Sequence, residues 1–487
     1  MSGTRVAHNT AYLVSAFIGQ KILAFAYFIV VARHAGVEGT GRYFLALTFT
    51  TMFSIFVDLG LSNIVVRETA KFPEKAQPIL STVLGLKAGL AVLTVAATLI
   101  MARLLNYPPE TRFMITLASA VMVLDSIHLV FYAAMRGFQN LRYEAIGVVS
   151  GQAVTISAGL LFIFLGLPLY WLIIALFLGS SWNVIWSASV LRRRFGIRPA
   201  LELDRDLLKF LWAVTVPFAL AGVFSRIYSY IDSVMLSRLG TESQVGLYGV
   251  AYKLTFAFQF LPMAFAAAIY PAMSEFYVKD RQQLSRIFAS ALKYLGLAAV
   301  PVSFGICVLA APIIRLVYGP AFAGAVMPLQ IVILSLIPAY LYWPAGSLLN
   351  ACDRQAQNTA VMALTMTSNI LLNAVFIPLF GASGAAAAAL ICNTILFGGA
   401  LWVSRQVTPH DWRAVFLPLA RIFAAGLIMV VPLVILRERI HVVPLILLGG
   451  AVYVAALYPL GALSVAETRR LVAVFLRRGR GVSDLMV

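Results

Sequence analysis

The chain has 487 residues, of which 61% are hydrophobic and only 11% are charged, and its mean hydropathy is +0.91. A soluble protein carries about 25% charged residues, so this composition excludes a soluble enzyme or binding domain and indicates a membrane protein. The net charge of +18 would suggest nucleic-acid binding in a soluble protein. Here the uneven distribution of Lys and Arg between loops accounts for most of it, and no nucleic-acid partner is expected.

Apolar stretches long enough to cross a hydrocarbon core about 30 Å thick recur along the whole chain. Transmembrane β-barrels show alternating segments of only about 10 residues, so the spans are predicted to be helices. We expect an all-α polytopic membrane protein of about fourteen helices. They are predicted at residues 9–33, 42–67, 78–103, 112–136, 144–166, 167–192, 208–238, 244–272, 286–311, 325–350, 357–378, 382–404, 412–435 and 440–462. The fifth and sixth form one apolar stretch that is interrupted only at "GLPLY" (residues 166–170).

Lysine and arginine are divided unevenly between the two sets of loops. About 24 of them lie in the loops and ends on the side of the N-terminus, and about 8 lie in the opposite loops. An even number of spans places both termini on one side, and cytoplasmic loops carry the excess of positive charge. Both termini are therefore predicted to be cytoplasmic.

A short loop motif occurs twice, once after the first predicted helix and once after the seventh. "RHAGVEGTGRY" begins at Arg33, and "SRLGTESQVGLY" begins at Ser237. With one gapped position, four residues match in each copy: Gly36, Glu38, Gly41 and Tyr43 align with Gly240, Glu242, Gly246 and Tyr248. "MRGFQNLRYE" after the fourth helix and "LNACDRQAQN" after the tenth form a fainter match. Chance recurrence of small turn-forming residues is the alternative explanation.

The repeat predicts the domain organisation. Six helices separate the two copies, so both halves have the same orientation and form a parallel repeat. We expect an N-terminal six-helix lobe at residues 1–192, a cytoplasmic linker at 193–207 and a C-terminal six-helix lobe at 208–404. Two additional transmembrane helices at 405–465 and a basic cytoplasmic tail at 466–487 follow. Two facing bundles leave a cleft between them, as in alternating-access transporters.

Three segments carry a resemblance to a known family. They are "GRYFLALTFTTMFSIFVDLGLSNIVVRETAK", "MRGFQNLRYEAIG" and "IPLFGASGAAAAALI". Together they resemble polysaccharide exporters of the multidrug/oligosaccharidyl-lipid/polysaccharide exporter superfamily, in its Wzx-like oligosaccharide-flippase branch. The resemblance implies a bacterial inner-membrane protein that moves undecaprenyl-pyrophosphate-linked oligosaccharides to the periplasmic leaflet. It implies the lipid-linked oligosaccharide, membrane lipids and polysaccharide-assembly proteins as partners.

Such a transporter needs a polar, cationic path, because sugars and pyrophosphate lose their water in hydrocarbon without replacement partners. Ionisable residues inside membrane helices are costly, so each is a functional candidate. Lys21 and Arg226 lie near the middle of the first and seventh predicted helices, at nearly equivalent positions of the repeat. We expect them to bind the pyrophosphate; pairing with an anion or a carbonyl group is the alternative.

Other charged residues are weaker candidates for substrate binding. Lys87 and Lys253 are expected to contact substrate or to be neutralised by Asp58 and Asp232, which lie at similar depths. Arg421 lies outside the repeated core. It is expected either to contact the lipid pyrophosphate or to reach the cytoplasmic face with its charged end, and the second interpretation is favoured.

Uncharged and titratable polar residues complete the candidate set. Asp125 and His128 are three residues apart and share a helix face, so they are expected to relay a proton or to hold neighbouring helices together. A further group of polar residues is expected to contact sugar or to bond neighbouring helices, and it comprises Asn183, Asn369, Asn373, Tyr228 and Tyr230.

The sequence contains no motif for an enzyme, a metal site or a cofactor. The three cysteines have no paired spacing, the five histidines do not cluster, and no loop is long enough for a soluble catalytic domain. We therefore expect a transporter without a metal or cofactor, and leave proton or sodium coupling open. Three alternatives remain: a lipid II flippase, a drug/cation antiporter of the same superfamily, and a membrane glycosyltransferase or glycan polymerase.

Overall fold

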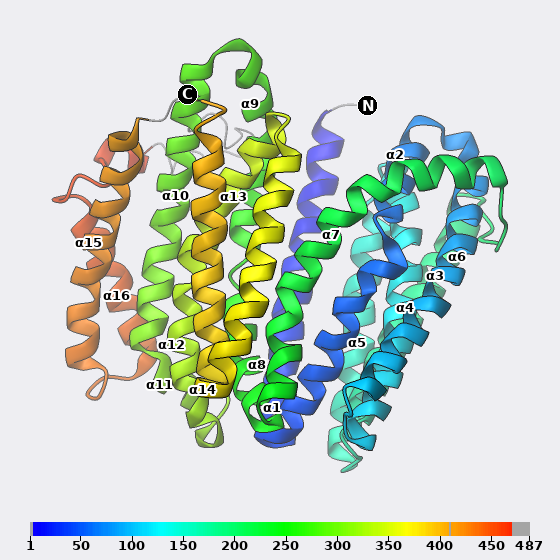
Figure 1. Cartoon of the computed structure of the whole chain (residues 1–487), viewed down its shortest axis with the longest axis horizontal. Coiled ribbons are helices and arrows are strands. Elements are labelled where there is room, and N and C mark those ends of the chain that lie inside the picture. Colours follow the sequence, from blue (N-terminus) through cyan, green and yellow to red (C-terminus); the bar gives the residue numbers. More distant parts are fainter. Residues whose placement is uncertain (1–2, 409–410, 470–487) are drawn as a thin grey trace. The chain divides into compact units, whose positions relative to one another are not determined.

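The computed structural model describes residues 3–408 and 411–469, with the side chains of residues 3–12, 14, 205, 206 and 209–221 left out of the description. Every regular element in this part of the chain is a helix (Figure 1), which confirms the predicted all-α class. Contacts within the chain group it into two compact units, Met1–Gly246 and Leu247–Val487.

The first unit contains seven α-helices and the beginning of an eighth. Their bounds are α1 (Gly3–Asp58), α2 (Leu61–Lys71), the short 3-10 helix η1 (Pro73–Lys75), α3 (Ala76–Leu104), α4 (Pro109–Gly137), α5 (Arg142–Phe164), α6 (Trp171–Arg194), α7 (Arg205–Leu239) and α8 (Glu242–Phe256). Helix α1 packs against α4, α5 and α7, and α6 packs against α4 and α5. Where α2, α3, α4 and α6 meet, an apolar core includes the fully buried Leu80, Tyr132 and Leu191.

Helix α1 joins residues that the sequence divides between two spans. Its backbone continues through the first loop copy with one non-helical residue, Gly36, at φ 67° and ψ −174°. Residues other than glycine rarely adopt a positive φ of this kind, so this position sets the kink. The second predicted span ends early, because the chain turns at residues 59–60 before α2 begins. As predicted, "GLPLY" separates α5 from α6.

The second unit contains the rest of α8 and eight further α-helices. They are α9 (Phe260–Lys279), α10 (Arg281–Val308), α11 (Ala310–Val317), α12 (Val326–Leu334), α13 (Leu336–Ala351), α14 (Gln355–Ser404), α15 (Trp412–Leu436) and α16 (Val442–Leu457), with the 3-10 helix η2 (Pro320–Ala325). Helix α14 combines the two predicted spans 357–378 and 382–404 across a kink at Gly381. Helix α15 packs against α10 and α16.

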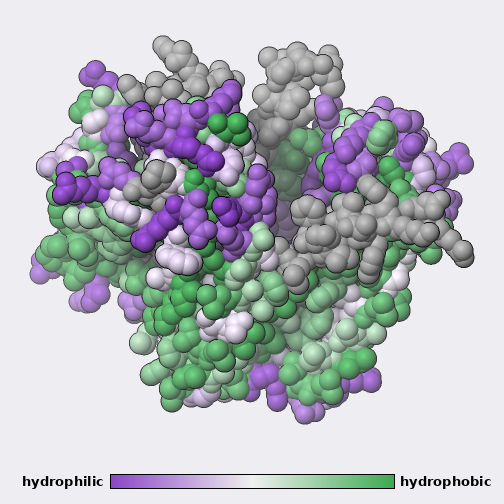
Figure 2. All heavy atoms as spheres, turned by 45° about the horizontal axis from the view of Figure 1, so that its top comes forward, coloured by the Kyte–Doolittle hydropathy of each residue, from purple (hydrophilic) through white to green (hydrophobic). Residues whose placement is uncertain are grey.

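Length and composition identify ten candidate membrane spans among the described residues, with α16 as a shorter apolar helix. Two of the ten, Ser15–Asp58 and Gln355–Ser404, each overlap two predicted spans, so the total of fourteen stays a prediction. The face shown in Figure 2 carries broad hydrophobic areas, with hydrophilic residues gathered mainly in the upper part of the view and a few at its lower rim. Val92 on α3 and Phe164 on α5 are exposed apolar side chains, as expected for contact with lipid.

The predicted boundary between the six-helix lobes also stays a prediction. Contact grouping divides the chain after Gly246 and counts α7 with the first unit, whereas the sequence places the linker at 193–207. Residues 470–487 of the predicted basic tail lie outside the described residues.

Candidate functional site

Lys21 and Arg226 lie on α1 and α7, two helices of the first unit that pack against each other. Lys21 is exposed and Arg226 is partly buried. Within the residues that the structure describes, neither side chain has an ion-pair or hydrogen-bond partner. A cation in an apolar helix without a protein anion is costly unless water or a bound anion compensates it.

The two cations lie at similar distances from the end where α1 and α7 meet. Lys21 precedes the kink at Gly36 by about 22 Å of helix, and Arg226 precedes Gly240 by about 21 Å, at 1.5 Å per residue. The two loop copies that contain these glycines contact each other directly. The expected equivalence of the two cations in depth stays a prediction.

The two loop copies pack through a reciprocal glycine contact. A methyl group on Gly41 would collide with the carbonyl oxygen of Glu242, and one on Gly246 would collide with the carbonyl oxygen of Val37. Each carbonyl belongs to the residue four positions before the opposite glycine, so the contact has the symmetry of the repeat. Glycine is required because only its backbone permits this close approach. We call the contact of residues 36–43 with residues 237–246 the loop junction.

Charged side chains surround the loop junction. The Nε atom of Arg42 donates to Glu242 at 2.5 Å, and its Nη1 atom donates to Glu110 at the start of α4, also at 2.5 Å. The hydroxyl of Thr111 donates to the second carboxylate oxygen of Glu242 at 3.3 Å. The side chain of Arg42 is 29% exposed and that of Glu242 is 23% exposed. The partly buried, charge-assisted bond between Arg42 and Glu242 is stronger than that of a fully exposed pair.

Further bonds stabilise the same end of the first unit. Tyr107, between α3 and α4, shares a 2.7 Å hydrogen bond with Ser237 on α7. Helix α8 begins with a reciprocal cap, in which the backbone N–H of Thr241 donates to the Gln244 side chain and the N–H of Gln244 donates to the Thr241 hydroxyl. This capping pattern holds Glu242 in the first turn of α8, where the helix dipole favours a carboxylate.

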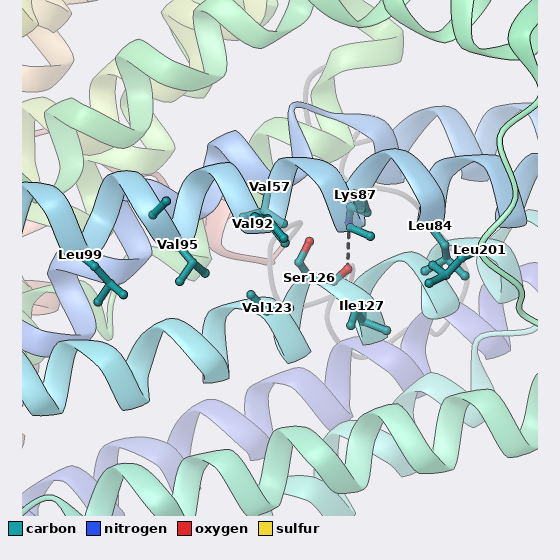
Figure 3. Close-up of a pocket in the computed structure, with 13 residues that line it drawn as sticks. Val57, Leu84, Lys87, Val92, Val95, Leu99, Val123, Ser126, Ile127 and Leu201 are labelled. Carbon is teal, nitrogen blue, oxygen red and sulfur yellow. Dashed lines mark hydrogen bonds between the residues drawn. The ribbon is translucent and has the colours of Figure 1, made fainter.

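Asp58 and Lys87 form an ion pair inside the first unit, with a distance of 2.7 Å between Oδ1 and Nζ. Lys87 is 2% exposed and also donates to the carbonyl of Ser126 at 2.8 Å (Figure 3). The hydroxyl of Ser62 donates to Asp58. The geometry therefore matches the neutralisation alternative for this pair, because both charges are already compensated by protein groups.

An apolar cavity of about 620 Å³ lies beside this ion pair. Helices α1, α3 and α4 line it with side chains such as Val57, Val95 and Val123, and Leu201 completes it (Figure 3). Its wall is almost entirely hydrocarbon apart from Lys87 and Ser126, so it does not resemble a sugar-binding surface.

Asp125 and His128 are in contact, as their spacing predicts. The Nε2 atom of His128 lies 3.2 Å from Asp125 Oδ1, and the hydroxyl of Ser180 on α6 donates to the same oxygen at 2.5 Å. The Nδ1 atom of His128 is buried without a partner among the described residues. The bond from Ser180 joins α4 to α6, which fits the helix-bonding alternative, while the buried imidazole nitrogen leaves proton relay open.

The remaining candidates have mixed surroundings. Asp232 is buried on α7 in the first unit, and Lys253 is partly buried on α8 in the second, so their pairing stays a prediction. Arg421 Nη1 donates to the carbonyl of Gly461 at 3.0 Å, which ties α15 to the turn after α16. Asn183 accepts a hydrogen bond from the hydroxyl of Tyr132 at 2.7 Å.

Four further polar candidates lie on α14 and α7. On α14, the Asn373 amide donates to the buried Asn369 side chain at 3.1 Å, one helical turn away. Tyr228 and Tyr230 are partly buried on α7. The described residues contain no group of three His, Cys, Asp or Glu side chains that could hold a metal ion.

Sequence reasoning missed the role of Arg42 and Glu110 at the loop junction. Glu242 was visible as a repeated residue, but nothing in its spacing indicated an arginine two hundred positions earlier as its partner. The available signal was the repeat itself, since two equivalent loops of a parallel repeat are brought to the same side of the membrane.

Comparisons with known proteins place the fold. A probable low-salt glycan biosynthesis flippase of Haloferax volcanii is 24% identical over 78% of this chain and 79% of its own length. A probable flippase of the same organism is 30% identical over 34% of this chain and 36% of its own length. The solved lipid II flippase MurJ, in an inward closed conformation, has a TM-score of 0.73 at 18% identity, covering 91% of this chain and 97% of that chain.

A solved multidrug resistance transporter of the multidrug/oligosaccharidyl-lipid/polysaccharide exporter superfamily, in an inward-facing conformation, has a TM-score of 0.68 at 16% identity. The match covers 80% of this chain and 94% of that chain. These relatives are named as flippases and transporters, not as enzymes. The family model described as MatE matches residues 217–379, and the model described as polysaccharide biosynthesis protein matches residues 6–277, more than half of the chain. The chain therefore belongs to the polysaccharide biosynthesis protein family of the multidrug/oligosaccharidyl-lipid/polysaccharide exporter superfamily.

Proposed function

We propose that the protein flips an undecaprenyl-pyrophosphate-linked oligosaccharide from the cytoplasmic to the periplasmic leaflet by alternating access. The two Haloferax volcanii relatives are named flippases, and one is assigned to glycan biosynthesis. The observation that carries the proposal is the pair of cations, Lys21 and Arg226, which have no anionic partner among the described residues. Both termini lie in the cytoplasm, in accordance with the distribution of Lys and Arg.

The cations supply what the lipid carrier cannot. The hydrocarbon tail stays in the bilayer, but the pyrophosphate loses its hydration when it leaves the interface. Arg226 offers a planar fork that can bind two phosphate oxygens at once, and Lys21 offers a mobile point charge. Asp58–Lys87 is a different case, because its charges already compensate each other.

The membrane potential favours the proposed direction. A pyrophosphate diester carries about two negative charges. Moving each of them outward across a membrane potential of 100 mV, inside negative, is favourable by about 2.3 kcal/mol. The empty carrier moves its cations inward as it returns, and the same inside-negative potential favours that step. An exchanged ion is therefore an additional driving force rather than a requirement. Asp125 and His128 are the residues we assign to such an exchange, because they combine a carboxylate with a buried imidazole nitrogen.

Reconstituted vesicles test this function. We expect Lys21→Ala and Arg226→Gln each to slow translocation of a lipid-pyrophosphate oligosaccharide by about tenfold or more, since a bond to a charged group contributes about 1.5–3 kcal/mol. Arg226→Lys should retain part of the rate, because it keeps the charge and loses the fork. Lys279→Ala is the matched control, since Lys279 pairs with Glu275 in an exposed position.

A double variant separates substrate binding from simple pairing. If Arg226 only neutralises Asp232, then Arg226→Gln combined with Asp232→Asn should restore transport. If Arg226 binds pyrophosphate, the double variant should stay slow at normal membrane abundance. Wild-type rates in both Lys21→Ala and Arg226→Gln would refute the proposed site.

Drug or cation antiport is the second candidate function, and the MatE match at residues 217–379 favours testing it. An organic cation requires acidic residues in its path, whereas the two unpaired candidates here are basic. Vesicles loaded with a fluorescent monovalent cation should show no export dependent on Lys21 or Arg226. Parallel assays with lipid II compare a peptidoglycan precursor with other glycans. Both substrates carry the same pyrophosphate, so a difference in translocation rate reports on the glycan.

A further inference from the structure

The loop junction contains an arginine with two carboxylate partners that belong to different parts of the repeat. Arg42 belongs to the first loop copy, and Glu110 lies in the first turn of α4 in the same half of the chain. Glu242 belongs to the second copy and begins α8, which continues into the second unit. The partners use different nitrogens of one guanidinium group, Nη1 for Glu110 and Nε for Glu242, so Arg42 holds both at once.

We propose that Arg42 is a switch residue of the transport cycle, which keeps the loop junction closed through Glu242 and retains Glu110 when Glu242 moves away. The inference rests on alternating access in the proposed function. It assigns to Arg42 and Glu110 a positioning role, in which they change the relative stability of the closed and open junction without touching substrate.

Charge compensation explains why two carboxylates are needed. Removing the partner of a partly buried charge is costly, because the remaining charge has lost water and gained nothing in return. Glu110 has a side-chain exposure of 49%, compared with 23% for Glu242, so it is the more hydrated of the two partners. When the junction opens, Arg42 exchanges a two-carboxylate environment for Glu110 and water. Opening therefore costs less than the rupture of an isolated ion pair.

The glycine contact makes the closed form specific. The approach of Gly41 and Gly246 to opposite carbonyls is so close that only a well-defined juxtaposition of the two copies permits it. Dispersion forces in this contact decrease steeply with small separations. The hydrogen bond between Tyr107 and Ser237 is lost together with it if α7 moves away from α3 and α4. These contacts favour two discrete states over a continuous opening.

The two carboxylates have opposite predicted effects, which distinguishes a switch from a structural ion pair. Glu242→Gln weakens only the closed junction, so the open state gains population. Glu110→Gln leaves Arg42 paired with Glu242 in the closed junction. In the open one Arg42 then has no ion-pair partner and only the electrostatic influence of Glu38 on its own helix, so the open state loses population. A purely structural network predicts that both changes loosen the junction.

Cysteine accessibility in lipid nanodiscs measures these populations without a glycan substrate. Thr40 is a suitable reporter position, because it is fully buried beside Gly41 and its hydroxyl bonds only to carbonyls of its own helix. The parent protein carries Thr40→Cys, with the three native cysteines replaced. We expect Glu242→Gln to raise the rate of maleimide labelling by about fivefold, as for an ion pair of about 1 kcal/mol. Glu110→Gln should lower the rate.

Charge exchange and a matched control complete the experiment. Arg42→Glu should raise labelling, and Arg42→Glu with Glu242→Arg should restore protection, because the exchanged pair can form again. Glu275→Gln, which removes the exposed pair with Lys279, should leave the rate unchanged. Unchanged labelling in Glu242→Gln, or increased labelling in Glu110→Gln, would overturn the proposal. If labelling behaves as expected but no lipid-linked glycan moves, the switch stands and the proposed substrate fails.

Discussion

At the scale of single residues, charged side chains inside the apolar helices fall into two kinds. Lys87 is bonded by Asp58 and by the carbonyl of Ser126, which leaves it compensated by the protein. Lys21 and Arg226 have no such partner among the described residues. The presence or absence of a protein partner thus distinguishes Lys87, which bonds neighbouring helices, from Lys21 and Arg226, which are available to an external anion. In the sequence, all three are equally unusual as charged residues in apolar helices.

The Asp58–Lys87 pair gives a direct test of this distinction. Lys87→Met or Asp58→Asn alone should destabilise the protein by about 3–5 kcal/mol, because the first leaves the partly buried Asp58, and the second the buried Lys87, without its ion-pair partner. The double variant should recover most of the thermal stability, since both charges are gone. Melting temperature in detergent and translocation rate report the outcome. Recovery of stability without transport would assign a transport role to the pair in addition to its structural one.

At the scale of elements, the helix ends carry the interactions that join distant segments. The loop junction brings together the kink of α1, the start of α4, the end of α7 and the start of α8. Gly41 and Gly246 allow the backbones of the two loop copies to approach each other closely, because glycine has no side chain. This accounts for the occurrence of the same short motif in both halves of the chain.

Gly41→Ala tests the close contact itself. The added methyl group meets the backbone of Glu242, which no rotamer change can relieve, so the closed junction should be disfavoured. We expect faster labelling of Thr40→Cys and a loss of transport of about tenfold, as for an overpacking cost of about 1–3 kcal/mol. Gly89→Ala is the control on α3, because a methyl group there meets no atom. Equal effects of the two substitutions would contradict this account.

A second contact between elements links α10 to the segment after α16. Lys293 donates to Glu467 at 2.7 Å. Burial raises the pKa of the Glu467 carboxyl group, but hydrogen bonds from Lys293 and Ser464 outweigh it, so that the pKa lies below its ordinary value. A lowered carboxyl pKa stabilises the folded protein above the unfolded pKa of about 4.3, and this contribution is lost as pH falls through the folded value.

The prediction for this contact is a pH-dependent difference in melting temperature. Glu467→Gln should melt below the wild type at pH 7, by an amount equivalent to less than about 1 kcal/mol because the pair is partly exposed. The difference should shrink as pH is lowered past about 4. Scanning fluorimetry of both proteins from pH 7 to 3.5 measures it. A difference that grows on acidification would show that another group dominates.

At the scale of the whole molecule, the chain is a multi-pass membrane protein of one transporter superfamily, with relatives in Haloferax volcanii that are named probable flippases. Its orientation is a prediction from charge. A reporter that is active only in the cytoplasm should be active when fused after Arg194 and silent when fused at Gly240, because the first position follows a run of arginines. The opposite pattern would invert the proposed direction of transport.

The sequence alone determined the class, the approximate helix positions and the repeat. Apolar runs of about 20 residues are local properties, since each helix satisfies its own backbone hydrogen bonds in hydrocarbon. The break at "GLPLY" follows from the residues at that position. At Gly36 the sequence predicts a loop between two spans, whereas the structure has one helix with a kink. The i, i+3 spacing of Asp125 and His128 also predicted their contact, because it depends on a single helix.

Only the tertiary structure decided which charges have partners. Asp58 meets Lys87, and Arg42 meets Glu242, through the packing of helices that are far apart in sequence. Whether two such side chains touch depends on the rotation, tilt and offset of both helices. A shift of one residue in the register of a helix turns its side chain by about 100° around the helix axis. Sequence spacing cannot supply these quantities. The repeated glycines marked the place of contact, but packing of α1 against the end of α7 and the start of α8 made it a junction.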